Sequence, residues 1–433
     1  MKVLVIGSGG REHTITWKLK QSPGVTQIYC APGNPGTASL GENVPIAADD
    51  LAGLLEFARK NEVDLTVPGP EVPLVNGIVD LFEEAGLAIV GPSAKAAQLE
   101  GSKVFTKQFL EKYGIPTAKY KVFDNAEEAE KELNEGIFNF PTVIKADGLA
   151  AGKGVIICPD KEEALAAVSS IMKDRAFGDS GNRIVVEEFL VGEEASFMAF
   201  CDGKSFLPMV PSQDHKAVFE GDKGPNTGGM GAFSADFILN PEQKAFVLEK
   251  IIIPTMRGMS AEGYPFKGIL YAGLMFTSDG PKVLEYNVRF GDPETQVILP
   301  RLKSDLAEIF MKTALGELDT CEIDWLENCA VCVVAASEGY PGSYSKGREI
   351  KGIDEAEKLP DTVVFHAGTT ETDGSLKTSG GRVLGITAVA SGLEEAIEKT
   401  YAAVDKINFE GMYCRRDIAA KGIRKLMEIG KQE

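Results

Sequence analysis

Three polar side chains alternate along the segment KVLEYNVRFGDPETQ, residues 282–296. Glu285, Asn287 and Arg289 are each two residues apart, so on a strand their side chains leave the same face. Two oxygen ligands on one face suit Mg²⁺, a hard cation that keeps several waters and shares phosphate oxygens. Arg289 adds a fixed positive charge that matches a carboxylate or a phosphoryl group in transfer. The alternative interpretation is an exposed strand whose alternate residues are simply polar.

A glycine-rich stretch, KADGLAAGKGV, has the composition of a phosphate-binding loop. It does not fit the Walker A pattern, because only three residues separate Gly148 from Gly152 and because Gly154 replaces the required hydroxyl residue. The loop is predicted to join two strands, TVIKA and VIIC, so no helix N-terminus follows Lys153 to receive a phosphate. We therefore expect a flap whose backbone N–H groups fold over phosphates.

Lysines on a neighbouring strand and helix are further candidates for phosphate binding. Lys145 interrupts the apolar run TVIKA, and burying its charge is costly without an anionic partner. A lysine that reaches solvent at the strand end is the alternative. Lys103 and Lys107 are four residues apart on one face of the helix predicted over 102–113, where Ser102 is a plausible N-cap.

The segment VVEEFLVGEE, residues 185–194, is a candidate for the base and sugar of a nucleotide. A strand that ends in acids is followed by Phe189 and Leu190, and then by more acids. Such a strand end supplies an apolar slot and backbone hydrogen bonds for adenine, and a following acid can accept the ribose hydroxyls. Taken by itself, the segment is more typical of a solvated run of charges.

Two further glycine-rich loops carry weaker signals. The turn GSGGREH has Glu12 where the dinucleotide fingerprint needs glycine, which argues against NAD. The turn around Gly10 could hold a single phosphate or could simply be a tight strand-to-helix turn. The loop at 212–234 contains Asp214 and His215 and could close on a small substrate. A purely structural polar loop is the alternative there.

The composition narrows the class of protein. The chain has 433 residues, of which 44% are hydrophobic and 25% charged, and its formal net charge is −19. A surface this acidic argues against nucleic acid as a partner. The seven cysteines are scattered, and Cys329 and Cys332 lie in an apolar run that predicts a core strand rather than a metal site. No apolar run is long enough to span a membrane, so we expect a cytoplasmic protein.

The elements that must position these residues fall into three predicted domains. Short apolar strands alternate with helical patterns up to about residue 100, which predicts a doubly wound parallel sheet. Two α+β units follow. The predicted domains are 1–101, an α/β domain; 102–327, with a lid subdomain at about 120–190; and 328–433, a small α+β domain.

The order of these motifs resembles the ATP-grasp superfamily, and more closely the phosphoribosylamine–glycine ligase (glycinamide ribonucleotide synthetase) family. The matching stretches run from end to end: VLVIGSGGREH, APGNPGTA, GPEVPLVNGIVD, QLEGSK, IKADGLAAGKGV, EEFLVGEEAS, QDHK, GPNTGGMGA, LYAGLM, NVRFGDPETQ and GGRVLG. Two places depart from the expected pattern, namely HTITWK, where smaller residues are expected, and Ala217, where a basic residue is expected.

The resemblance implies an ATP-grasp fold and a reaction. In it, ATP, glycine and 5-phosphoribosylamine give ADP, phosphate and glycinamide ribonucleotide, a step of purine synthesis. The glycine carboxylate attacks the γ-phosphate to form glycyl phosphate, and the ribosylamine nitrogen then displaces the phosphate. Such a reaction asks for positioning and charge neutralisation more than for an acid–base residue. The implied cofactors are ATP and Mg²⁺ or Mn²⁺, and the implied state is a monomer.

The resemblance also implies roles for individual residues. For ATP these are Lys107, Lys145, Gly148, Gly152, Lys153, Gly154, Glu187, Phe189, Leu190 and Glu193, with Glu194 as the alternative to Glu193; for the metal, Glu285 and Asn287; and for the substrates, Gly10, Asp214, His215, Arg289 and Asp292. Arg289 and Lys145 are expected to be catalytic. Two other interpretations stay open here. One is a purine-pathway carboxylase of the same superfamily, and the other is a nucleotide-binding regulator without turnover.

Overall fold

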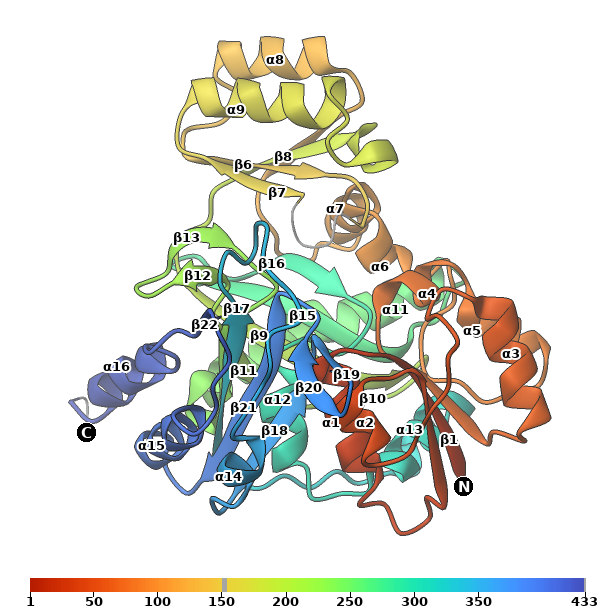
Figure 1. Ribbon diagram of the computed structural model, residues 1–433. Coiled ribbons are helices and arrows are strands. Elements are labelled where there is room, and N and C mark those ends of the chain that lie inside the picture. The colour runs from red at the N-terminus through yellow and green to blue at the C-terminus, as the bar shows by residue number, and fades with distance from the viewer. Residues whose placement is uncertain (150–153, 432–433) are drawn as a thin grey trace.

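The N-terminal part of the chain folds around a parallel sheet with the strand order β3-β2-β1-β4 (Figure 1). The computed structural model describes residues 1–149 and 154–431. Alternate residues of β1 enter two different cores, because Leu4 packs with residues of α3 and α5 whereas Val5 packs with residues of α1. Helices therefore cover both faces of this sheet, as predicted. The bounds are β1 Lys2–Gly7, α1 Gly10–Leu19, β2 Gln27–Pro32, α2 Pro35–Ala38, β3 Glu42–Asn43, α3 Leu51–Lys60 and β4 Leu65–Pro68.

Two predicted elements of this region differ in the structure. The helix expected over about 74–86 is divided into α4, Glu71–Val75, and α5, Ile78–Glu84. The division falls at Gly77, whose φ of +86° is a left-handed conformation that interrupts a helix. The strand expected over LAIVG is reduced to a single bridge between Thr66 and Ile89. Two short helices follow, α6 Gln98–Gly101 and α7 Lys103–Lys112, the latter capped by Ser102 as predicted.

Residues 120–190, the lid unit, form a separate small layer above the rest of the molecule (Figure 1). Its antiparallel sheet has the order β5-β8-β6-β7, and α8 and α9 pack on one face of it around their own core. The glycine-rich loop joins β6 to β7, two paired antiparallel strands, as predicted. The bounds are β5 Tyr120–Phe123, α8 Ala126–Glu135, β6 Thr142–Ala146, β7 Val155–Cys158, α9 Lys161–Val168 and β8 Ile184–Glu188.

A large sheet lies below the lid unit, with the order β16-β15-β9-β11-β14-β17-β21-β18. Its strands come from the middle and the end of the chain, so residues after 328 continue the same sheet. The strands are β9 Glu193–Asp202, β10 Phe206–Pro208, β11 Ser212–Asp214, β14 Gly231–Ser234, β15 Lys267–Thr277, β16 Gly280–Asn287, β17 Cys329–Ser337, β18 Thr362–His366, β21 Arg382–Ala390 and β22 Met412–Tyr413. Two hairpins stand apart from it, β12 Ala217–Phe219 with β13 Lys223–Asn226, and β19 Thr369–Thr372 with β20 Ser375–Thr378.

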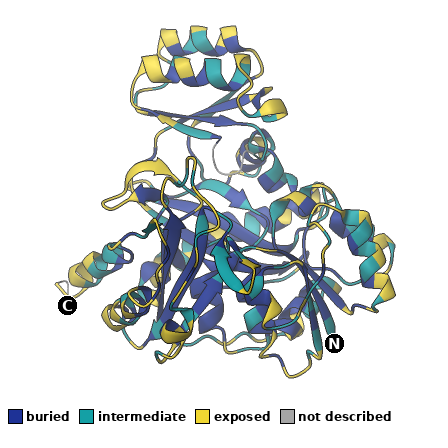
Figure 2. Ribbon diagram, viewed as in Figure 1, coloured by how far each residue is buried: buried dark blue, intermediate teal, exposed yellow. Residues whose placement is uncertain are grey.

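Helices cover this sheet on both faces, and buried residues fill the interior of each layer (Figure 2). The helices are α10 Pro241–Val247, α11 Ile253–Ala261, α12 Thr295–Ile298, α13 Leu306–Leu315, α14 Ile353–Glu357, α15 Leu393–Val404 and α16 Ala420–Ile429. Cys329 and Cys332 lie buried in β17 as free thiols, in agreement with the prediction of a core strand. Among the residues that the structure describes, no helix combines the length and apolar character needed to cross a bilayer.

Candidate active site

One face of the large sheet collects most of the predicted polar residues. The strand register places Asn287 opposite Tyr271 and Glu285 opposite Gly273, and Gly273 in turn lies opposite Ser196. Directly opposed residues share a face, and residues two apart on a strand share it too. This face, called here the substrate face, therefore carries Glu285 and Asn287 together, as predicted. It lies beside the lid unit, because Lys145 of β6 donates a hydrogen bond to the carbonyl of Leu284 over 3.1 Å.

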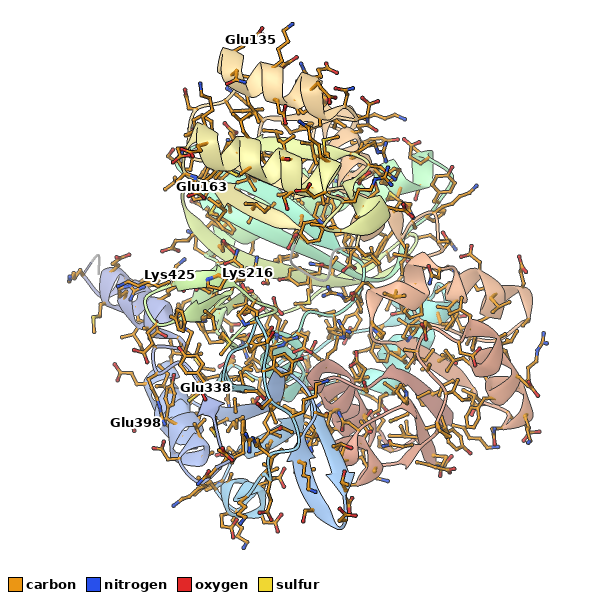
Figure 3. The ribbon with its side chains drawn as sticks, turned by 45° about the horizontal axis from the view of Figure 1, so that its top comes forward. Glu135, Glu163, Lys216, Glu338, Glu398 and Lys425 are labelled. Carbon is orange, nitrogen blue, oxygen red and sulfur yellow. The ribbon has the colours of Figure 1, made fainter. Side chains whose placement is uncertain are left out.

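The same register separates two consecutive acids. Glu194 lies opposite Met275 and so belongs to the substrate face, whereas Glu193 lies opposite Phe276 on the other face. Their partners differ accordingly, since Glu194 pairs with Lys216 and Glu193 with Lys425 of α16, both at 3.1 Å. Figure 3 labels these two lysines. Of the two acids named for the ribose, the structure brings only Glu194 together with Glu285 and Asn287.

Glu285 carries a stabilised negative charge. Its burial alone would raise the pKa of the carboxyl group, but the positive charges of Lys216 and Lys103 outweigh burial, and the pKa is lowered. A carboxylate held ionised next to an amide oxygen is a suitable donor set for a hard divalent cation. Within 1–149 and 154–431, no cluster of three or more His, Cys, Asp or Glu side chains could hold a metal by itself. A cation at Glu285 and Asn287 would therefore take its remaining ligands from phosphates and water.

Arg289 is held by two carboxylates from the N-terminal part of the chain. Its Nη2 lies 2.8 Å from Glu100, and its Nε lies 3.3 Å from Glu71. The guanidinium also donates to the side-chain oxygen of Asn287 over 3.2 Å and to the carbonyl of Phe290 over 3.1 Å. Arg289 thus contacts a predicted metal ligand directly.

A single carboxylate neutralises the two predicted phosphate-binding lysines. The Nζ atoms of Lys107 and Lys145 each lie 3.0 Å from the carboxylate of Glu187, and none of the three side chains is more than 8% exposed. Burial lowers the pKa of Lys107 to about 8, against the opposing effect of Glu187. Two buried ammonium groups that share one anion leave an excess of positive charge, which favours an anionic ligand. The structure thus joins Lys107, Lys145 and Glu187 into one cluster.

A small apolar cluster lies next to these charges. Leu190 packs with Ala118 and Met275, and Leu284 covers the same cluster. The exposed side chain of Phe189 lies outside it, with 37% of the residue accessible to solvent. Leu190 is thus brought to this apolar cluster, whereas Phe189 is not. Ala118 and Met275 gave no sequence signal, because neither belongs to a polar or glycine-rich motif.

The described ends of the glycine-rich loop are anchored. Gly148 has a φ of +134°, and a Cβ atom there would lie 2.5 Å from Oγ of Ser180, so the position requires glycine. The N–H of Ala146 donates to the carbonyl of Gly154 over 2.8 Å. The neighbouring Asp147 accepts hydrogen bonds from Ser102 and from the N–H of Val104 at the start of α7. The predicted roles of Gly152 and Lys153 lie outside the described residues.

In the QDHK segment, successive side chains point to opposite sides of the chain. Asp214 and Lys216 lie toward the acids of the substrate face. Burial raises the pKa of Asp214 to about 7, and Lys216 opposes that rise. His215 instead packs against Phe233, and its Nε2 accepts a hydrogen bond from the N–H of Ala419 over 3.3 Å. Burial lowers the pKa of His215 to about 3. The structure thus brings Asp214 to the predicted substrate site but not His215.

The first strand-to-helix turn is filled by its own acid. Glu12 accepts hydrogen bonds from the N–H of Gly9 and from Nε of Arg11, both at 2.6 Å. A Cβ atom on Gly69 would lie 2.0 Å from this carboxylate. An internal anion therefore occupies the place of a dinucleotide phosphate, which agrees with the argument against NAD. Packing is preserved because glycines surround Glu12.

Gly10 and Asp292 lie together at this turn. The N–H of Arg11 points to Asp292 over 3.4 Å, and a Cβ atom on Gly10 would lie 2.7 Å from the amide of Gln296. Arg382 of β21 lies 3.3 Å from the Asp292 carboxylate. Burial would raise the pKa of Asp292, but Arg382 and Arg11 lower it. Two predicted substrate residues are thus adjacent, at a junction of the N-terminal, middle and C-terminal parts.

Sequence reasoning missed several residues that complete the site. Tyr271 donates a 2.5 Å hydrogen bond to the buried carboxylate of Glu294, and Ser196 lies 2.8 Å from the Tyr271 hydroxyl. The missed residues are Glu71, Glu100, Ser196, Lys216, Tyr271, Met275, Glu294 and Arg382. Lys216 could have been found as the last residue of QDHK. The acids on Arg289 lie in the matching stretches GPEVPLVNGIVD and QLEGSK, but they are about two hundred residues earlier in the chain, and no local spacing links them to Arg289.

Comparison with known proteins agrees with this geometry. Three models of phosphoribosylglycinamide synthetase match: the N domain at residues 1–100, the ATP-grasp domain at 101–295 and the C domain at 330–421. The phosphoribosylamine–glycine ligase of Caldanaerobacter subterraneus is 52% identical over 420 residues, which are 97% of this chain and 100% of that protein. The Vibrio vulnificus enzyme of the same name is 50% identical over 98% of this chain and 99% of its own.

A solved structure gives the same result. The crystal structure of phosphoribosylamine–glycine ligase from Thermotoga maritima superposes with a TM-score of 0.82 at 37% identity, and the match covers 96% of this chain and 100% of that one. The ATP-grasp fold and the order of the domains are therefore shared over the full length. By sequence and by fold, this chain belongs to the phosphoribosylamine–glycine ligase family.

Proposed function

We propose that the chain ligates glycine to 5-phosphoribosylamine at the expense of ATP, giving glycinamide ribonucleotide, ADP and phosphate. The observation that carries the proposal is the substrate face itself. Glu285, Asn287 and Arg289 lie at the end of β16. The cluster of Lys107, Lys145 and Glu187 lies beside them, because Lys145 contacts the carbonyl of Leu284. The apolar cluster that contains Leu190 and Leu284 adjoins both. These are charges for a polyphosphate next to an apolar cluster for a base.

The proposed site offers a complementary protein group to the base, the ribose and the phosphates of ATP. Adenine would lie against the apolar cluster of Ala118, Leu190 and Met275. Glu194, rather than Glu193, would accept the ribose hydroxyls. Lys107 and Lys145 would exchange part of their contact with Glu187 for phosphate oxygens, so the buried positive charge stays compensated. Because the cluster exists before ATP arrives, little reorganisation is required at the moment of reaction.

Glu285 and Asn287 would hold Mg²⁺ or Mn²⁺, which would neutralise charge on the phosphates. Arg289 keeps Asn287 in place and offers its remaining N–H to the transferred group or to the glycine carboxylate. Asp214 and Lys216 frame the glycine subsite, and Asp292 borders it on the side of α1. The role of Gly10 near the ribose phosphate stays a prediction from the family resemblance, because the carboxylate of Glu12 fills that turn. Attack of the glycine carboxylate on the γ-phosphate then needs only alignment and charge neutralisation.

The proposal extends to the surroundings of the enzyme. All seven cysteines are free thiols, which fits a reducing compartment, and we propose that the enzyme works in the cytoplasm. The monomeric state stays a prediction from the family resemblance.

The test is phosphate release from ATP with defined co-substrates. Glycine with 5-phosphoribosylamine is expected to support turnover, and bicarbonate is not. Release that depended on bicarbonate would favour the carboxylase interpretation. ATP binding without release under any of these conditions would favour a regulator without turnover.

A further inference from the structure

The loop that carries Asp214 and Lys216 is held from outside the ATP-grasp region. After Lys216 the chain forms the β12–β13 hairpin, which is a separate two-stranded sheet. Its strands do not join the large sheet, so their position depends on side-chain contacts. Several of those contacts come from residues 413–421, near the end of the chain, and Val218 of β12 also packs with Met230 and Ala336.

Arg415 is the centre of these contacts. The residue is only 1% exposed, and its Nη1 donates to the carbonyl of Ala217 and to Asp222, both over 3.0 Å. Its Nε and Nη2 donate to the two oxygens of Asp417, each over 2.7 Å. A bidentate pair of this kind fixes the plane of the guanidinium as well as its position. Asp417 thereby aims Arg415 at the hairpin.

The hairpin is attached at further points on the same side. The N–H of Gly221 donates to Asp417 over 2.8 Å, and Lys421 pairs with Asp222 at 2.8 Å. Phe219 packs edge-on against Tyr413. The first strand of the hairpin, β12, and its turn are therefore tied to the C-terminal segment.

We propose that Arg415 is a positioning residue for the glycine subsite, because it fixes the backbone directly after Lys216 and so sets where Lys216 and Asp214 stand on the substrate face. This inference rests on the proposed function. Lys216 contacts Glu194 at 3.1 Å and influences both Asp214 and Glu285 electrostatically. A shift of the hairpin would therefore alter the glycine side of the site. In the part of the chain that the structure describes, the lysine cluster for the ATP phosphates, built on α7, β6 and β8, has no contact with Arg415, and Glu194 and Glu285 are coupled to the hairpin only through Lys216.

The test compares Arg415→Met with Arg416→Met, varying glycine and ATP separately in steady-state kinetics. For Arg415→Met we expect kcat/KM for glycine to fall by about 10- to 100-fold, as small misplacements of a positioning group do. KM for ATP should change by a clearly smaller factor, because Glu194 and Glu285 are affected only through Lys216. Arg416 is the matched control, because it is the next residue and its half-exposed side chain contacts Asp405 and the ring of Tyr401, both outside the hairpin. Its contact with the hairpin is the main-chain N–H that donates to Glu220, which a side-chain replacement leaves in place. Its replacement is expected to leave both parameters unchanged.

Two more variants keep the proposal testable if Arg415→Met fails to fold. Asp222→Asn removes one anchor on the hairpin but leaves the Arg415–Asp417 pair intact, and should weaken glycine use in the same direction. Arg415→Lys should recover part of the loss. Equal loss for glycine and ATP, or unchanged glycine kinetics in folded variants, would overturn the proposal. A wild-type enzyme that releases no phosphate with glycine would instead refute the proposed function.

Discussion

The Nζ atom of Lys145 lies 3.0 Å from Oε1 of Glu187, in an ion pair whose side chains are 8% and 2% exposed. Lys107 reaches the other oxygen of the same carboxylate at the same distance. Glu187 therefore acts as the internal anion of a site that we propose receives polyphosphate. Its carboxylate neutralises part of the charge of the two lysines, and bound phosphates would share that task.

Replacing Glu187 by Gln tests whether bound phosphates can take over the role of the Glu187 carboxylate. The loss of one partner from a buried ion pair typically costs about 3–5 kcal/mol, so the variant should melt at a lower temperature than wild type. ATP should then raise the melting temperature of Glu187→Gln by more than it raises that of wild type, since phosphates replace the missing anion. Differential scanning calorimetry with and without ATP measures both effects.

The neighbouring acid supplies the control for that experiment. Glu188 pairs with Lys282 at 3.4 Å and is 30% exposed, outside the lysine cluster. Glu188→Gln should show the ATP-induced shift of wild type. Equal shifts in Glu187→Gln and wild type would contradict the exchange of anions.

A second prediction concerns the metal. Glu285→Ala should leave the fold intact, because the side chain lies on the substrate face and forms no part of a hydrophobic core. Phosphate release should fall by about 100-fold or more, the usual effect of losing an electrostatic group that acts on the transition state. A titration of Mg²⁺ should no longer change the residual rate. Wild-type activity in this variant would remove Glu285 from the mechanism.

Local spacing explains which parts of the site could be predicted. Glu285 and Asn287 share a face in any strand, and Lys145 needs an anion in any buried strand, so neither inference depends on the partner strands. The choice between Glu193 and Glu194 is different. It depends on which face of β9 is covered by α16, and that is decided by pairing with β15, far away in sequence.

The same limit applies to His215 and to the predicted domains. Successive side chains of the QDHK segment point to opposite sides, so His215 lies away from Asp214, and its Nε2 accepts a hydrogen bond from Ala419, near the end of the chain. The sequence after residue 328 predicts a separate domain, because it contains several strand patterns and a helix pattern of its own. Only the tertiary pairing of β14 with β17 reveals that they extend the sheet of the middle region. Sequence patterns specify elements, whereas the contacts between distant elements decide how those elements combine.

Acid sensitivity is a third prediction, because His13 and His215 are buried, His366 is half-buried, and all three are neutral at pH 7. Burial lowers the pKa of His13 to about 3, of His215 to about 3 and of His366 to about 4, from an ordinary value of 6.5. The unfolded chain takes up protons below pH 6.5, but the folded chain does not. The stability that these groups provide is therefore complete above pH 6.5 and is lost as the pH falls from there toward their folded pKa values.

The contribution of one histidine can be isolated with His13→Gln. Nδ1 of His13 accepts a hydrogen bond from the N–H of His366 over 2.8 Å, and a Gln side chain offers an acceptor that does not titrate. Between pH 7 and pH 5 the advantage of wild type over this variant should shrink by about 2 kcal/mol. Urea unfolding at both pH values measures the difference. An advantage that stayed constant would show that His13 does not titrate differently in the two states.

The last prediction concerns how Arg289 is held. Glu100 binds Arg289 at 2.8 Å with one oxygen and accepts the N–H of Val288 over 2.8 Å with the other, so it fixes both the side chain and the end of β16. Glu100→Gln keeps an acceptor but removes the charge. We expect a stability loss of about 1–3 kcal/mol and a drop in kcat of about tenfold or more, since misorientation of Arg289 and Asn287 weakens charge neutralisation in the transition state.

Glu71→Gln is the matched comparison for Glu100→Gln, because Glu71 contacts the same guanidinium at the longer distance of 3.3 Å and is 26% exposed. An exposed and longer pair contributes less than a buried one, so Glu71→Gln should lower kcat by a smaller factor. Isothermal titration with ATP should give similar affinities for both variants, because neither acid contacts the lysine cluster. If Glu71→Gln impaired turnover more than Glu100→Gln did, Glu71 would be the acid that orients Arg289. Glu100, which joins that side chain to the end of β16, would then have only a structural role.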